Sequence, residues 1–167
     1  RFLERLATSP MKITEIENKL TYFEIPLHGP CYIAMLADMD ELRSDEGCVD
    51  HELHAFALYN ITQEILAEEP GAAVFRYKEN KVMTILSGLG EEELYARAQE
   101  LAEEIRVSTK RFMKFTVTLG IGTICYQLHA IRYSCRASEA ALEYRLLMGH
   151  DQVVSITDLE KRETSPL

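Results

Sequence analysis

Residues 31–40, CYIAMLADMD, form an almost unbroken apolar run, and this run constrains the fold more than any other part of the chain. An apolar stretch without polar alternation is typical of a strand that is covered on both faces. It is too short for a membrane-spanning helix, which needs about 20 apolar residues. The sequence therefore predicts a sheet that carries helices on both of its sides.

The spacing of apolar residues predicts the elements around this strand. Apolar side chains at helical intervals indicate three long helices, at about 51–68, 91–109 and 128–148. Stretches rich in β-branched residues indicate four more strands, at about 72–77, 81–87, 115–126 and 152–156. This order places a hairpin inside β-α units, so we expect an α+β sandwich whose central mixed, mainly antiparallel β-sheet is flanked by helices.

Two of the predicted helices carry stripes of residues that we expect to face the sheet. In the helix at 91–109 the stripe consists of Leu94, Ala98, Leu101, Ala102 and Ile105. In the helix at 51–68 the residues expected to face inward are Leu53, Phe56, Ala57, Asn60, Ile61 and Ile65.

The charge balance excludes one class of function for this segment. The net charge is −9 at pH 7, whereas a protein that wraps nucleic acid needs a basic face. We therefore expect no direct nucleic-acid contact, and the lack of a long apolar run predicts no membrane contact. The cysteines Cys31, Cys48, Cys125 and Cys135 form no C-x-x-C pair and are predicted to be buried or free thiols in a reducing compartment. Because the chain begins at Arg1 rather than methionine, we expect a fragment of a longer protein.

Four stretches of the chain, taken in order, resemble the GGDEF family of nucleotide cyclase domains, which make cyclic di-GMP. They are YIAMLADMDEL (32–42), RYKENKVMTIL (76–86), FTVTLGIGTICY (115–126) and ASEAALEYRLLMGHDQVV (137–154). The first resembles the family's first strand with its Asp-x-Asp ending, and the second resembles its signature hairpin. The resemblance implies a GGDEF-like, nucleotide-cyclase-like sandwich over residues 28–158.

The catalytic signature of that family is replaced in this sequence. The positions that read Gly-Gly-Asp-Glu-Phe in the family are Lys78, Glu79, Asn80, Lys81 and Val82 here. The family's glycines let the backbone approach the nucleotide, and its acids help hold the divalent cations that act on the triphosphate. Long side chains stand at both glycine positions, and a lysine in place of an acid would repel a metal ion. We therefore expect a degenerate domain with no enzyme activity, no catalytic residue, no metal and no cofactor.

Asp38 and Asp40 end the first predicted strand, where the resemblance implies a metal-binding aspartate. Together with Asn80 and Lys81, these aspartates occupy the positions at which the resemblance implies a former metal site. One interpretation is a residual cation site, and the other is a pair of solvated carboxylates that lead into a loop. Because the opposing acids are replaced, we expect solvated carboxylates.

Arg76, Lys78 and Lys81 gather basic charge around the turn of the predicted hairpin. These three residues are the candidate contacts for a phosphate-bearing ligand. The alternative is a solvated charged turn that protects a sheet edge from aggregation.

Residues 1–27 are predicted to form a helical lead-in, and the polar residues 159–167 to begin a C-terminal linker. Phe2, Leu3 and Leu6 share one side of the first helix, which we expect either to contact a second copy or to cap the domain's own core. The lead-in resembles the segment that enters degenerate GGDEF-like domains of bacterial transcription regulators.

What this resemblance implies is a non-catalytic regulatory and dimerisation domain that relays a signal in the cytoplasm. In such regulators it lies between a receiver domain, as in two-component response regulators, and an AraC-type helix-turn-helix DNA-binding domain. The expected partners are a second copy, in a homodimer, and the adjacent domains of the parent chain. The alternative is a ligand-sensing domain that binds a nucleotide or a small metabolite without turnover. An active nucleotide cyclase or a phosphatase is less favoured, because the sequence places only Asp38 and Asp40 together for such chemistry.

Overall fold

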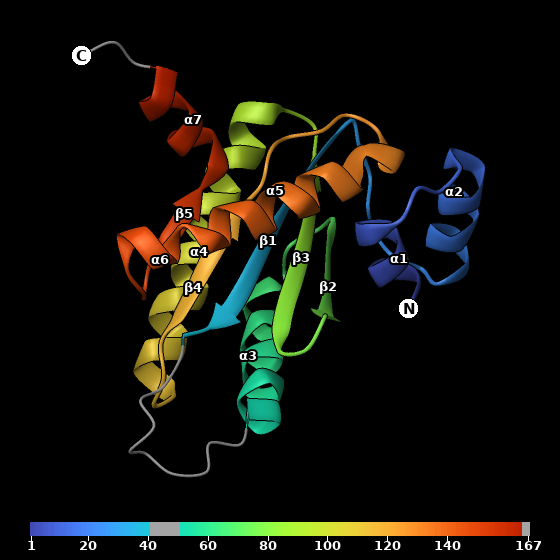
Figure 1. Cartoon of the computed structure of the whole chain (residues 1–167). Helices are drawn as coiled ribbons and strands as arrows, with labels where there is room; N and C mark the ends of the chain where they lie inside the picture. Colours follow the sequence, from blue (N-terminus) through green and yellow to red (C-terminus); the bar gives the residue numbers. More distant parts are fainter. Residues whose placement is uncertain (41–50, 165–167) are drawn as a thin grey trace.

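The structure, a computed structural model, describes residues 1–40 and 51–164 (Figure 1). In these two ranges five strands form one sheet in the order β2-β3-β1-β4-β5. Neighbouring strands are antiparallel except for β4 and β5, which are parallel. The predicted mixed, mainly antiparallel sheet is therefore confirmed. The strands are β1 (Cys31–Met39), β2 (Ala72–Tyr77), β3 (Lys81–Gly88), β4 (Val117–Ile121) and β5 (Val153–Ser155).

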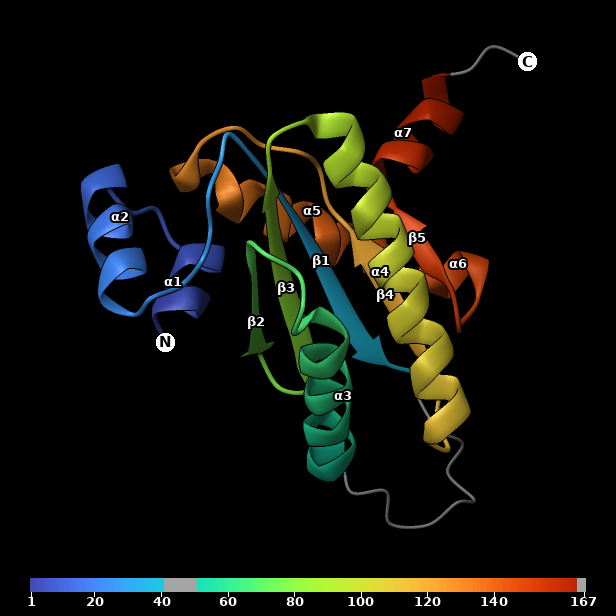
Figure 2. The same ribbon diagram turned by 180° about the vertical axis from the view of Figure 1, so that it is seen from behind.

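Helices cover both faces of this sheet, as Figures 1 and 2 show from opposite sides. Every residue of the central strand β1 is buried, as its continuous apolar sequence predicts. The helices are α1 (Phe2–Thr8), α2 (Ile13–Tyr22), α3 (His51–Leu66), α4 (Glu91–Phe112), the 3-10 turn η2 (Leu128–Ala130), α5 (Ile131–Glu143), α6 (Arg145–Met148) and α7 (Ile156–Thr164).

One face of the sheet packs against α5, with α1 and α2 beside it (Figure 1). Close approach of α5 to the strands depends on Gly120 in β4. A Cβ atom on Gly120 would lie 2.3 Å from the carbonyl oxygen of Ser138 in α5, which is closer than two such atoms can come. The core on this side includes Phe2, Leu6, Ile16, Leu20, Leu36, Ile85, Cys135 and Leu142.

The other face packs against α3 and α4 (Figure 2). The predicted stripe of α4 is confirmed, because Leu94, Ala98, Leu101, Ala102 and Ile105 are all buried. The predicted inner face of α3 is wrong. Leu53 and Phe56 are 59% and 53% exposed, whereas the residues that α3 buries are Ala55, Leu58, Thr62 and Leu66.

In the C-terminal part, the helices and strands begin and end at other residues than predicted. The single helix expected at 128–148 is divided into η2, α5 and α6, and β4 is much shorter than the predicted strand. Helix α7 follows β5 directly and occupies residues that were predicted to begin a polar linker. Among the helices of residues 1–40 and 51–164, none is both long and apolar enough to cross a membrane.

Candidate functional site

The end of β1 lies between the hairpin and β4. Asp38 is the register partner of Lys81 on β3 and of Thr118 on β4, so the signature hairpin and the predicted aspartates do meet at this edge. The side chains of Asp38 and Asp40 are 13% and 4% exposed. The expectation of solvated carboxylates is therefore wrong, and the reason is a set of partners from distant parts of the chain.

Arg145, the first residue of α6, contacts both carboxylates. Its Nη2 lies 2.5 Å from Oδ2 of Asp38, and its Nη1 lies 3.4 Å from Oδ1 of Asp40. Removing two carboxylates from water costs several kcal/mol per ion unless opposite charge and hydrogen bonds compensate. The guanidinium provides that opposite charge for both aspartates.

Asp40 accepts further hydrogen bonds on both of its oxygens. The hydroxyls of Thr116 and Thr118 donate at 2.6 and 2.7 Å, the backbone N–H of Asp151 donates at 2.9 Å, and Nδ1 of His150 lies 3.0 Å away. Burial by itself raises the pKa of Asp40. The hydrogen bonds from the threonines, Asp151 and His150 outweigh burial, so the pKa of Asp40 lies below the ordinary value of a carboxyl group.

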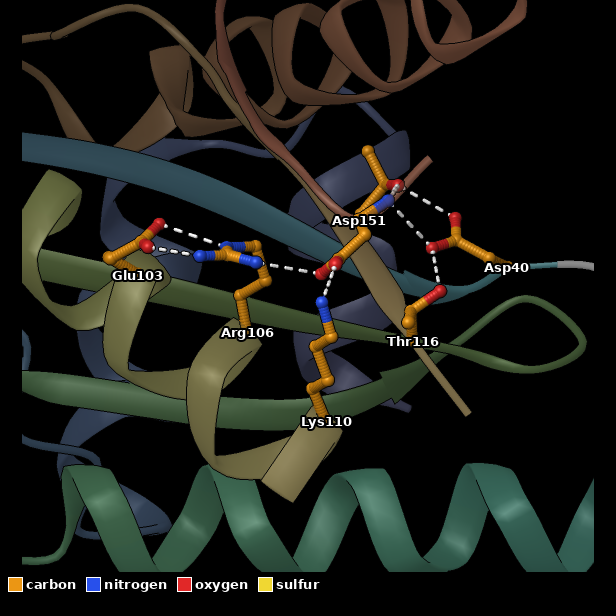
Figure 3. Close-up of polar contacts among 7 residues, drawn as sticks. Asp40, Glu103, Arg106, Lys110, Thr116 and Asp151 are labelled. Atoms are coloured by element: carbon orange, nitrogen blue, oxygen red, sulfur yellow. Dashed lines mark hydrogen bonds and ion pairs between the residues drawn. The ribbon is translucent and has the colours of Figure 1, made fainter. Parts of the chain in front are cut away.

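Asp151 connects this cluster to α4, as Figure 3 shows. Its carboxylate accepts hydrogen bonds from Arg106 and Lys110, each at 2.7 Å. Arg106 also contacts Glu103 within α4. Burial would raise the pKa of Asp151, but the bonds from Lys110 and Arg106 lower it overall. A continuous set of polar contacts therefore runs from Asp40, just after β1, through Asp151 to α4.

The hairpin turn is fixed by Glu139 of α5. The ammonium of Lys78 lies 2.5 Å from Oε2 of Glu139, and the hydroxyl of Tyr77 donates to Oε1 at 2.8 Å. Burial, together with the bond to Glu139, raises the pKa of Tyr77 well above its ordinary value, so the phenol remains a neutral donor. Lys78 has a φ of 51°, in the left-handed region that favours glycine.

The structure divides the predicted basic cluster between the two faces of the sheet. Side chains alternate along β2, so Arg76 lies on the face covered by α3, beside its register partner Val82. Lys78 and Lys81 instead line a cavity of about 300 Å³ on the α5 face. The other residues of this cavity are Leu36, Glu139, Leu142, Glu143, Arg145 and Leu146. A joint phosphate contact by all three predicted residues is therefore wrong, because Arg76 points away from the other two.

These residues do not fit the divalent cation that the fold family implies. Within residues 1–40 and 51–164, no three His, Cys, Asp or Glu side chains lie together as a metal ion would need. The lone pairs of Asp40, about four in a carboxylate, are already engaged by protein donors. Asp38 binds Arg145 and faces Lys81 across the strand pair. Asn80 offers no charge at the hairpin.

The sequence analysis missed Arg145, Thr116, Thr118 and Asp151. Thr116 and Thr118 lie two residues apart, just before and within β4, and this spacing was a sign that both hydroxyls point to one face of the extended chain. Along the sequence, Arg145 is more than 100 residues away from the aspartates that it contacts. No local sequence pattern indicates that α6 packs against the end of β1.

The predicted contact face of α1 lies largely inside the domain. Phe2 and Leu6 are 7% and 2% exposed and belong to the core beneath α5, while Leu3 is partly buried against it. The expected capping of the domain's own core is therefore observed for Phe2 and Leu6. Leu3 lines a cavity of about 440 Å³, together with Phe23 and Phe75.

The GGDEF-like domain family matches residues 8–144, and the chain belongs to this family. No curated protein matches it. Among solved structures it is similar to the active GGEEF domain of a diguanylate cyclase from Vibrio cholerae, with a TM-score of 0.59 and 15% identity over 85% of this chain and 90% of that one.

Two further solved structures show the same similarity. One is an EAL/GGDEF domain protein from M. capsulatus, with a TM-score of 0.62 and 14% identity over 88% of this chain and 99% of that one. The other is the diguanylate cyclase SiaD from Pseudomonas aeruginosa in complex with its activator SiaC, with a TM-score of 0.60 and 16% identity over 89% and 60% of the two chains. At these identities the likeness concerns the fold, and the predicted cyclase-like sandwich is confirmed.

Proposed function

We propose that this chain is a degenerate GGDEF-like domain that regulates without catalysis. The observation that supports this most strongly is the contact of Arg145 with Asp38 and Asp40. A cyclase of this fold needs acids free to hold metal and nucleotide phosphates. Here the acids at the end of β1 are bound by the chain itself, and Lys78 and Lys81 stand in the hairpin.

The role is the relay of a signal in a bacterial transcription regulator, in the cytoplasm, between a receiver domain and an AraC-type DNA-binding domain. The packing of the helices supports a path for such a relay. Helix α1 packs on α5, and α5 in turn contacts α7, with α1 and α7 on opposite sides of the molecule (Figures 1 and 2). A shift of α1 against α5 would change the position of α7 and of whatever it precedes.

Self-association is part of this proposal, since a relay domain of this kind acts as a homodimer. The partly exposed Leu3 and the apolar rim around it offer a contact for a second copy. Sedimentation velocity over a range of concentrations tests this. We expect wild-type protein to dimerise and Leu3→Glu to weaken the dimer, while Leu89→Glu, at a side chain that is 85% exposed elsewhere, leaves it intact. A wild-type protein that stays monomeric throughout would contradict self-association.

A second candidate is a domain that senses a ligand without converting it. The cavity that contains Lys78, Lys81 and Arg145 favours this function, because an anionic metabolite would meet three cations there. Glu139 and Asp38 already pair with two of those cations, which argues against a strong site. Isothermal titration calorimetry with GTP, cyclic di-GMP and sugar acids distinguishes the two candidates. Saturable heat that Lys81→Ala abolishes would support sensing, and flat traces would support the relay alone.

A further inference from the structure

Helix α6 is attached to the domain in an unusual way. None of its residues is buried, and Leu146 and Leu147 are 86% and 83% exposed. Apolar packing therefore contributes little to its position. The charged contact of Arg145 with the end of β1 is instead its principal link to the sheet.

The segment around α6 directs several donors at the same two carboxylates. Arg145 contacts Asp38 and Asp40, Nδ1 of His150 lies 3.0 Å from Oδ1 of Asp40, and the backbone N–H of Asp151 donates to Oδ2 of Asp40. Within the described ranges, the cations nearest to Asp38 belong to this segment and to the hairpin. Asp38 and Asp40 thus provide the negative charge that a cation site needs, and the cation that they bind is a side chain of the same protein, Arg145.

We infer that the guanidinium of Arg145 is a built-in cation that replaces the divalent metal of the family at the end of β1. Two buried carboxylates repel each other and need a counter-charge at a fixed place. A guanidinium is always protonated, and its planar set of donors contacts both carboxylates at once. This end of the sheet consequently folds without a metal ion, and the same contact holds α6, β5 and the start of α7 in place.

Thermal unfolding in the presence of divalent cations tests the first consequence. Because the aspartates already have their cation, MgCl₂ and MnCl₂ should leave the Tm of the wild-type protein unchanged relative to KCl of matched ionic strength. A rise in Tm that is specific to a divalent cation would overturn the inference.

Substitution of Arg145 tests the second consequence. Arg145→Ala removes the guanidinium that contacts both buried carboxylates, and we expect the Tm to fall by roughly 6–15 °C. Arg136→Ala is the matched control, because Arg136 is an exposed arginine of α5 for which the described contacts include no acid, and its Tm should stay close to wild type.

The double variant Asp38→Asn with Arg145→Ala separates a counter-charge from a packing role. If Arg145 acts as the cation, removing the negative charge of Asp38 should recover part of the Tm that Arg145→Ala loses. Losses that simply add in the double variant would show that Arg145 contributes only through packing and would contradict the inference. The comparison also holds if Arg145→Ala alone fails to fold, since the double variant is then the one expected to fold.

Discussion

Lys78 shows what remains of the signature hairpin at the scale of one residue. Its left-handed backbone, with φ at 51°, is the conformation that a glycine adopts without strain, and glycine is the family's residue at this position. The hairpin therefore keeps a backbone suited to glycine and bears a lysine on it. The contact between Lys78 and Glu139 partly offsets the strain.

Lys78→Gly and Lys78→Ala test this interpretation together. Both variants lose the ion pair with Glu139, which is exposed enough to be worth little. Only glycine also removes the strain of the left-handed backbone. We expect Lys78→Gly to be more stable than Lys78→Ala by about 1 kcal/mol. Urea unfolding of the two variants measures the difference, and equal stabilities would contradict the assigned backbone conformation.

Asp40 makes the stability of the protein depend on pH. Its pKa is lower in the folded state than the ordinary value near 4. A carboxyl group with a depressed pKa contributes stability above its unfolded pKa, and that contribution is lost as the pH falls through the folded pKa. Acid should therefore remove the contribution of Asp40 below about pH 4.

Asp40→Asn tests that dependence. An amide cannot accept all the hydrogen bonds that the carboxylate accepts, so we expect a loss of about 2–4 kcal/mol at pH 7. The difference in free energy of unfolding between Asp40→Asn and wild type should become smaller as the pH is lowered. Urea unfolding at several pH values measures this difference. Glu68→Gln, at an exposed carboxylate, is the control and should unfold like wild type at every pH. A difference that is constant with pH would show that charge is not the cause.

The sequence predicted the positions of these residues better than their partners. Asp38 and Asp40 were placed correctly at the end of a strand, because a continuous apolar run followed by acids has a clear boundary. Their burial was missed, since it depends on Arg145 and Asp151, which arrive from far along the chain. A local pattern carries no information about such a contact.

At the scale of elements, α3 shows how a correct helix can be assigned the wrong face. Apolar residues recur at helical spacing on more than one side of α3, so the spacing fixes the period and leaves the orientation open. The structure buries Thr62, whose hydroxyl donates to the carbonyl oxygen of Leu58 one turn earlier. Because that internal bond satisfies the hydroxyl, a polar residue occupies a core position that the sequence pattern would give to an apolar one.

Two substitutions in α3 distinguish the faces. Leu58 is fully buried and Phe56 is 53% exposed. We expect Leu58→Ala to lower the free energy of unfolding by about 2–5 kcal/mol, and Phe56→Ala to lower it by less than about 1 kcal/mol. Chemical denaturation measures both values. A larger loss for Phe56→Ala would restore the face predicted from the sequence.

At the scale of the whole molecule, the order of elements carried most of the information about the fold. A hairpin between two β-α units, followed by a strand, a helix and a last strand, leaves few ways to build a sheet. The order β2-β3-β1-β4-β5 is one that this pattern allows. Helix α7 was missed because the polar composition of residues 159–164 also suits a linker, which is what the sequence predicted there.

The whole-molecule account is that a cyclase fold is retained while the acids of its catalytic edge are bound internally. Arg145, the lysines of the hairpin and the contacts from Asp151 together occupy the edge where the family holds metal and phosphates. In the proposed relay, α5 connects α1 to α7, because it contacts both helices. This account depends on the absence of turnover.

The most direct measurement is an assay for cyclic di-GMP. Purified protein is incubated with GTP and either Mg²⁺ or Mn²⁺, and the products are separated and identified by mass spectrometry. An active diguanylate cyclase, run in parallel, sets the detection limit. The account predicts no cyclic di-GMP above the level of a protein-free blank. Formation of cyclic di-GMP in proportion to the amount of protein would contradict it.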